Sequence, residues 1–255
     1  MNTPALLVRQ FRYEQKIFWR NPAAMFFTVA FPVLLLVIFA SLNSGDHPAL
    51  LSGVTFTQYY VPSMAAFGLM SACFANLAGR FVHRRESGNL KRLRATPAPL
   101  TALIGGFIAN ALLVALLITA INIAIGVAFY RVHLPYHWAA FCIVLVIGAS
   151  AFCAIGVAFS LLVPNVDATD PMIFGVFMPI VFISGAFFPI AHTSPLSRLA
   201  ALFPVRHLID AMFATFDPRL HGNGLATHDL AVVAAWGIAA ALFAGRRFRW
   251  SASRT

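Results

Sequence analysis

Long stretches without a single charged side chain limit this sequence to very few folds. Residues 21–45 and 95–130 contain no Asp, Glu, Lys or Arg. About 20 apolar residues are enough to cross the hydrocarbon core of a bilayer. Charged residues make up only 10% of the chain, against about 25% in soluble domains. The sequence therefore predicts an all-α membrane protein with one transmembrane domain over residues 1–255.

A basic segment, residues 79–100, separates two of these apolar runs and orients the chain. It holds six of the eighteen Lys and Arg residues, and such clusters mark cytoplasmic loops. Counting outward from this loop predicts six spans, at residues 23–42, 59–77, 101–129, 138–163, 172–189 and 230–244. This topology puts fourteen of the eighteen cations and both termini in the cytoplasm. We expect the third span to be tilted or kinked near Gly105 and Gly106.

Residues 4–20 have the pattern of a helix that lies along the membrane surface. At about 100° per residue, the cations fall on one side and the apolar residues on the other. The cations are Arg9, Arg12, Lys16 and Arg20, and the apolar residues are Leu7, Phe11 and Phe18. A helix of this kind can rest at the inner headgroup layer. The alternative is a disordered basic tail.

Within residues 190–227, the stretch 196–216 is apolar enough to be mistaken for a seventh span, but it carries charges through its middle. Arg198, Arg206 and Asp210 lie within the apolar stretch 196–216, as does the helix-breaking Pro204. Each charge at the bilayer centre costs about 2.5–3.5 kcal/mol on insertion scales. We therefore expect an outer, re-entrant element of short amphipathic helices in the outer leaflet, with Arg206 and Asp210 paired one helical turn apart.

Several kinds of chemistry have no matching pattern in this sequence. No phosphate-binding loop motif occurs, because the only lysines are Lys16 and Lys91 and neither follows a glycine. No predicted span has a charged residue away from its ends, which disfavours an ion-coupled carrier. The eight histidines show no metal-ligand spacing, and the cysteines lie in apolar runs. We expect no catalytic residue, cofactor or metal in this chain, and no nucleic-acid partner, because the cations follow the membrane topology.

Three segments together resemble a known family. Residues 85–97 are similar to the E-x-G-x-L-x-x-L-x-x-T-P pattern that follows the second span in type 2 permeases of ATP-binding cassette exporters. Residues 183–190 resemble the S-G-x-x-F-P stretch of that family, and residues 202–211 resemble its N-P-x-x-x-x-x-x-A stretch. Phe203 stands where the family commonly has Asn. The likeness covers the whole chain.

The resemblance implies a coupling helix after the second span that docks on a separate ATPase subunit, which carries the ATP and Mg. It also implies a second permease chain, as a homo- or heterodimer. The residues expected to couple are Glu86, Gly88, Leu90, Lys91, Arg92, Leu93 and Arg94. Leu90 and Leu93 form an apolar stripe, which alternatively packs against the chain's own helices. Glu86 is a candidate partner for an arginine of the N-terminal helix, or else forms a solvated salt bridge.

Aromatic and Met residues on the second and fifth spans are candidates to line a substrate path. They are Phe67, Met70, Phe74, Phe174, Phe177, Met178 and Phe182. The alternative is ordinary helix packing. Asn76, Asn110 and Asn122 are expected to bond between helices.

The expected function is that of a permease subunit in the cell membrane. It would move a lipophilic or lipid-linked substrate out of the cytoplasm or inner leaflet. Drug, lipid, polyketide and polysaccharide all remain open as the cargo. Two alternatives also remain: a stand-alone channel or uncoupled carrier, and a membrane anchor subunit without a path of its own.

Overall fold

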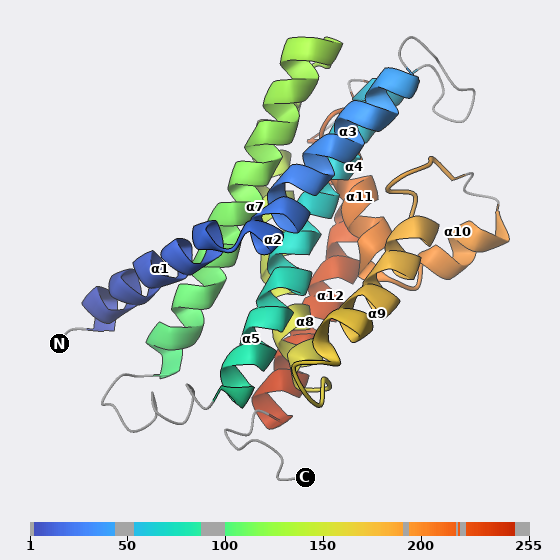
Figure 1. The fold of residues 1–255 in the computed structure, drawn as a ribbon. Coiled ribbons are helices and arrows are strands. Elements are labelled where there is room, and N and C mark those ends of the chain that lie inside the picture. Colours follow the sequence, from blue (N-terminus) through green and yellow to red (C-terminus); the bar gives the residue numbers. More distant parts are fainter. Residues whose placement is uncertain are drawn as a thin grey trace.

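A computed structural model describes residues 3–43, 54–87, 100–190, 194–217, 219 and 223–247. Every regular element in these ranges is a helix, and the helices form a tilted bundle (Figure 1). In chain order they are α1 (Thr3–Arg20), α2 (Pro22–Met25), η1 (Phe26–Ala30), α3 (Phe31–Leu42), α4 (Phe56–Met70), η3 (Ser71–Asn76), α5 (Leu77–Glu86), α7 (Leu100–Tyr130), α8 (Trp138–Ser160), α9 (Thr169–Ile183), α10 (Pro195–Ala200), α11 (Pro204–Ala214) and α12 (Thr227–Arg247). The all-α prediction is confirmed for the described part of the chain.

Five continuous helices in the described ranges are long and apolar enough to cross a membrane. They are Pro22–Leu42, Phe56–Glu86, Gly105–Tyr130, Trp138–Ser160 and Thr227–Arg247. Each contains most of a predicted span, namely the first, second, third, fourth and sixth. The helix in the place of the fifth, α9, has only 15 residues. At 1.5 Å per residue it is about 22 Å long, short of a hydrocarbon core of about 30 Å.

The predicted fifth span, residues 172–189, is therefore wrong at its C-terminal end. Helix α9 stops at Ile183, and Gly185 has a φ of +90°. A glycine in this left-handed conformation commonly follows the last helical residues, because it carries no Cβ. The Tyr59 hydroxyl donates to the Gly185 carbonyl over 2.5 Å and holds the turn against α4. The Ser-Gly pair of the sequence motif thus ends the helix.

The second span is longer than predicted. Helices α4, η3 and α5 run continuously from Phe56 to Glu86, so residues 79–86 are helical and do not belong to a loop. No proline interrupts this stretch after Pro62, and charges at its end are tolerated where the helix leaves the apolar layer. Most of α4 and η3 is buried in the centre of the bundle.

Close contacts between helix backbones tighten the bundle around this central helix. A Cβ added at Gly156 of α8 would lie 2.8 Å from the Cys73 carbonyl oxygen of η3. A Cβ added at Gly237 of α12 would lie 2.7 Å from the Cα of Ala151 in α8. Small residues at such crossings let membrane helices approach closely.

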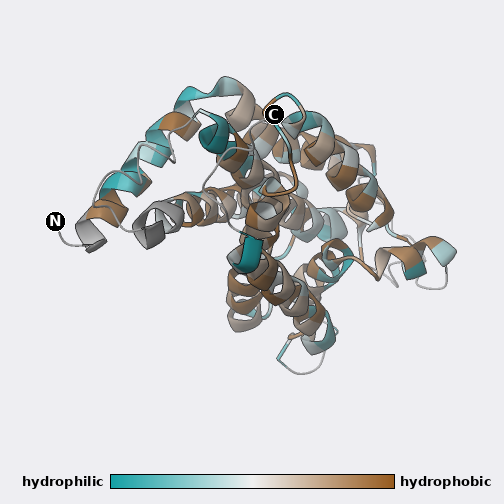
Figure 2. Ribbon diagram, turned by 90° about the horizontal axis from the view of Figure 1, so that it is seen from below, coloured by the Kyte–Doolittle hydropathy of each residue, from teal (hydrophilic) through white to brown (hydrophobic). Residues whose placement is uncertain are grey.

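Helix α1 has the predicted length and the predicted separation of charge. Arg9, Arg12, Lys16 and Arg20 are exposed, whereas Phe18 is buried. Figure 2 shows polar and apolar residues alternating along α1, while the long helices are mainly apolar. The alternative of a disordered tail is wrong for residues 3–20.

Helix α1 crosses α7 at Gly105 and Gly106, where added Cβ atoms would meet Leu7 and Gln10. Helix α7 remains α-helical from Leu100 to Tyr130, so its hydrogen bonding is not broken at the two glycines, and the tilt or kink stays a prediction. The two glycines give α1 room to cross.

The outer element contains the two short helices α10 and α11. The predicted pair is present, with Arg206 Nε 2.6 Å from Asp210 Oδ2. Helix α11 packs between α4, α8 and α12, and most of its side chains are buried. Protein neighbours therefore cover much of the helix that we expected to dip into the outer leaflet.

Candidate transport cleft and helix anchor

A cavity of about 360 Å³ opens between the first apolar helix, the central helix and α9. Its apolar wall includes Phe27, Phe31, Phe67, Phe174, Phe177 and Met178. We call it the transport cleft, because it is the candidate for the predicted substrate path. Four of the seven residues predicted for a substrate path line it: Phe67, Phe174, Phe177 and Met178. The cleft therefore combines the predicted second and fifth spans with the first.

The other three predicted path residues lie elsewhere. Met70 and Phe74 are buried in the core, and Phe182 is 56% exposed away from the cleft. Phe177 connects the two groups, since its ring stacks on Phe67 at 5.8 Å between centroids and lies 5.4 Å from Phe74. Such aromatic pairs contribute about 0.5–1.5 kcal/mol of stability beyond their buried area. Met70 and Phe74 therefore fit the alternative, in which these side chains only pack between helices.

One end of the transport cleft is polar. Asn21, Asn76, Arg80 and Asp170 line it. Sequence reasoning did not place these residues in a path, because each lies at a predicted span end, where polar side chains are ordinary. A second cavity, of about 440 Å³, shares Asn21, Asn76 and Arg80 with the cleft and extends toward His83 and Arg84. An apolar space thus borders a basic one.

Glu14 of α1 is the central residue of a buried charge cluster. Its carboxylate pairs with Arg80 and Arg84 of α5, the latter at 2.5 Å. Gln10 donates to the same carboxylate at 2.6 Å, and the Arg84 guanidinium lies 4.6 Å from the centre of the Phe107 ring. Burial raises the pKa of the Glu14 carboxyl, and the two arginines oppose that shift. The ion pairs thus offset a large desolvation cost.

Two neighbouring residues attach the other side of α5 to the turn between α8 and α9. Arg85 donates from Nη1 to the Ser160 carbonyl at 3.0 Å and from Nη2 to the Val163 carbonyl at 2.5 Å. Arginines commonly satisfy the free carbonyls at the end of a helix in this way. The Val166 amide donates to Glu86 Oε2 at 3.0 Å. Helix α5 is therefore held both by α1 and by the α8–α9 turn, an arrangement we call the helix anchor.

The helix anchor differs from the expectation for Glu86. The acid that pairs across to the other element is Glu14, on the N-terminal helix, and the arginines are on α5. Glu86 instead faces the α8–α9 turn, because two residues along a helix rotate its direction by about 200° from that of Arg84. The remaining predicted coupling residues, Gly88, Leu90, Lys91, Arg92, Leu93 and Arg94, lie outside the described residues.

Two of the three predicted asparagine contacts join helices. Gln15 of α1 donates to Asn110 of α7 at 2.9 Å, and Asn76 donates to Thr28 of η1 at 3.3 Å. Asn122 donates to the Ile118 carbonyl of its own helix, so the interhelical prediction is wrong there.

Comparison with known proteins adds an independent observation to this geometry. Residues 4–216 match the model of the family described as ABC-2 type transporter. The chain belongs to the ABC-2 type transporter family. Members of this family are membrane subunits of ATP-binding cassette transporters, so the family implies an ATP-binding cassette partner and a bilayer around the helices. The predicted resemblance is confirmed.

Curated relatives of this ABC-2 protein are bacterial. The inner membrane transport permease YadH of Escherichia coli K12 is 23% identical over 210 residues, which cover 80% of this chain and 77% of the relative. Proteins of the same name in Escherichia coli O157:H7 and Shigella flexneri match equally well. Family and relatives support a multi-pass membrane protein that takes part in transport.

Proposed function

We propose that the chain is the permease subunit of an exporter, in which a separate ATPase drives changes in the transport cleft. The helix anchor carries this proposal. The segment 88–94 directly follows α5, and α5 is bonded to α1 on one side and to the turn before α9 on the other. A force applied to 88–94 would therefore reach α9, one wall of the cleft. Rigid elements joined by such networks can carry coupling between sites.

The cargo that fits the cleft is lipophilic or lipid-linked. Aromatic rings and Met178 form its wall, while Arg80 and two asparagines lie at one end. Binding sites that are mainly apolar with a few polar groups orient amphipathic molecules. We further propose that the protein lies in the cell membrane with both termini in the cytoplasm, and that two permease chains pair around the path.

The test compares two double variants in proteoliposomes that contain the permease and its ATPase. Leu90→Ala with Leu93→Ala removes the stripe proposed to dock, so the ATPase should co-purify poorly. Arg85→Gln with Glu86→Gln loosens the anchor, so the ATPase should still bind, but substrate-stimulated ATP hydrolysis and transport should fall by about tenfold or more, which corresponds to about 1.4 kcal/mol of coupling.

Arg246→Gln, an exposed charge at the end of α12, is the matched control and should change none of these measurements. Full transport by the Arg85/Glu86 variant would disprove transmission through the anchor. Transport without any ATPase would favour a stand-alone channel or carrier. Normal ATPase binding with no flux in any variant would favour an anchor subunit.

A further inference from the structure

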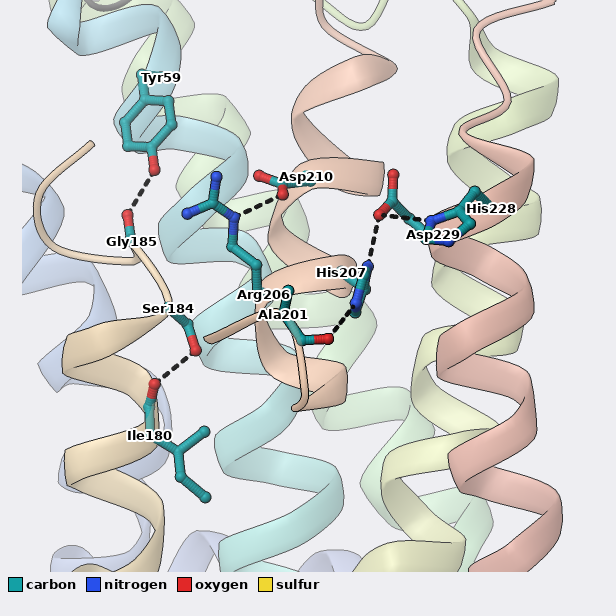
Figure 3. A network of polar contacts seen from close by, with 10 residues as sticks. All are labelled: Tyr59, Ile180, Ser184, Gly185, Ala201, Arg206, His207, Asp210, His228 and Asp229. Atoms are coloured by element: carbon teal, nitrogen blue, oxygen red, sulfur yellow. Dashed lines mark hydrogen bonds and ion pairs between the residues drawn. The ribbon is translucent and has the colours of Figure 1, made fainter. Parts of the chain in front are cut away.

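Two histidines and an aspartate meet at the outer element, away from the transport cleft. His207 belongs to α11, and His228 and Asp229 belong to the first turn of α12 (Figure 3). The Nδ1 atom of His207 is 2.6 Å from Asp229 Oδ1, and that of His228 is 3.8 Å from the same oxygen. One possible metal-ligand atom from each of the three side chains lies within 4.8 Å of the other two. Twenty residues separate the two histidines in the sequence, so local spacing does not reveal the cluster.

Both ring nitrogens of His207 face oxygen atoms that accept hydrogen bonds, so a second proton or a metal cation is needed beside its ring. Its Nε2 atom lies 2.9 Å from the Ala201 carbonyl oxygen, and its Nδ1 atom faces a carboxylate. Both partners are acceptors, whereas a neutral imidazole has a single N–H to donate. If that hydrogen goes to Ala201, the lone pair on Nδ1 points at a negative oxygen. Either a second proton or a metal cation must lie there.

The surroundings of His207 are those of a metal-binding histidine. Such histidines commonly donate their second ring nitrogen to a backbone carbonyl, which selects the tautomer and orients the ring. Ala201 provides that carbonyl, and the His207 side chain is buried. In Figure 3 the ring lies between the carbonyl of Ala201 and the carboxylate of Asp229. The nearest charged neighbours, Arg206 and Asp210, are paired with each other at 2.6 Å.

The three ligand atoms, now within 4.8 Å of one another, must draw closer to hold a metal ion. Tetrahedral bonds of about 2.0–2.1 Å place ligand atoms about 3.3 Å apart. The 2.6 Å contact would open and the 3.8 Å contact would close. His228 is free to turn, because its side chain is 83% exposed. A cavity of about 360 Å³ beside the cluster has room for a water molecule as the fourth ligand.

We propose that His207 Nδ1, His228 Nδ1 and the Asp229 carboxylate bind one divalent transition-metal ion of the zinc type. Two imidazoles and one carboxylate suit Zn²⁺ or Co²⁺, whereas Mg²⁺ and Ca²⁺ prefer oxygen ligands. The bound ion would join α11 to the start of α12 and so fasten the outer element to the last membrane helix. This site is independent of the proposed export function.

The test uses the purified, chelator-treated chain without a polyhistidine tag. We expect one Zn²⁺ per chain by elemental analysis, visible absorption bands of tetrahedral Co²⁺ after Co²⁺ is added, and a higher unfolding temperature with Zn²⁺. The variants His228→Ala and Asp229→Asn should each weaken metal binding by more than about a hundredfold, because the loss of an outer-shell partner alone costs about tenfold to a hundredfold. His228 is the safest position to change because it is exposed.

His133→Ala is the matched control, since His133 is exposed and belongs to the loop between α7 and α8. It should bind Zn²⁺ like the unchanged chain. Equal Zn²⁺ affinity in the His228→Ala variant would overturn the site. So would the absence of stoichiometric Zn²⁺ in the unchanged chain, which would mean that only a proton bridges His207 and Asp229.

Discussion

At the scale of single residues, the most consequential side chain is Glu14, whose partners the sequence does not reveal. Glu14 is the lone acidic residue among the first forty-five, on a helix whose other charges are exposed cations. At about 100° per residue it falls on the apolar side with Leu7 and Phe18, but the sequence does not show which residues it meets there. In the structure it is fully buried and pairs with two arginines from α5. A carboxylate in that position fastens α1 to the central helix.

Replacing Glu14 with Ala should destabilise the protein strongly. The variant leaves Arg80 and Arg84 without a counter-charge, since the side chains of both are at most 15% exposed. Breaking a buried ion pair by removing one partner costs about 3 kcal/mol or more. We expect a lower unfolding temperature in detergent, and looser attachment of α1 in hydrogen exchange. Asp167→Asn, which changes an exposed acid in the α8–α9 turn, should change the unfolding temperature little. An equal loss in both variants would contradict a special role for Glu14.

At the scale of elements, close packing of helices accounts for features that composition alone leaves open. Gly237 of α12 lies against the backbone of α8, whereas Gly245, farther along the same helix, has no atom within 4 Å of an added Cβ. The two glycines look alike in the sequence. Only the neighbouring helix makes one of them necessary.

The pair Gly237→Ala and Gly245→Ala should therefore have opposite effects. In the first variant the new methyl group would lie 2.7 Å from Ala151 Cα, so α8 and α12 must move apart. Overpacking of this kind costs about 1–3 kcal/mol. In the second variant Ala should be neutral or stabilise the helix by about 0.5–1 kcal/mol. Thermal unfolding of the two variants measures the difference, and a Gly237→Ala protein as stable as the parent would refute the close contact.

At the scale of the whole molecule, the long helices that the structure describes run alternately up and down through the bundle. In Figure 1, α5 ends, α7 begins and α12 ends at the same lower side of the bundle. Although α9 is too short to be a full span, it leaves that side as a spanning helix would, and α10 and α11 follow before α12. The C-terminal end of α12 therefore lies on the same side as the end of α5, which belongs to the basic segment 79–100. This agrees with a cytoplasmic C-terminus, which stays a prediction.

Cysteine labelling tests the orientation of the whole chain, after its three native cysteines have been replaced with alanine. Single cysteines at Ser87 and Ser251 should react with an impermeant reagent only from the cytoplasmic side. A cysteine at Thr193 should react only from outside. The reason is the excess of cations near the first two positions. Labelling of Ser251 from outside would mean an odd number of crossings and would disprove the proposed orientation.

The sequence by itself determined the class of this protein, the family and most of the helix positions. Uncharged runs of membrane-spanning length and clustered cations depend on the bilayer, which acts on each segment separately and so can be read from local composition. The same holds for the exposed cations of α1, which all lie within one helix, and for Arg206 and Asp210, which are one helical turn apart. Both features depend only on local helix geometry.

Only the tertiary structure decided which polar and aromatic residues meet. Glu14 finds Arg80 and Arg84 across more than sixty residues of chain, and His207 finds Asp229 across twenty-two. The ring of Phe177 packs on Phe67, whereas Phe182, five residues farther along the same helix, is 56% exposed. Such pairings depend on how helices rotate and cross, which is set by close contact between backbones over the whole bundle. The periodicity of one helix alone does not contain that information.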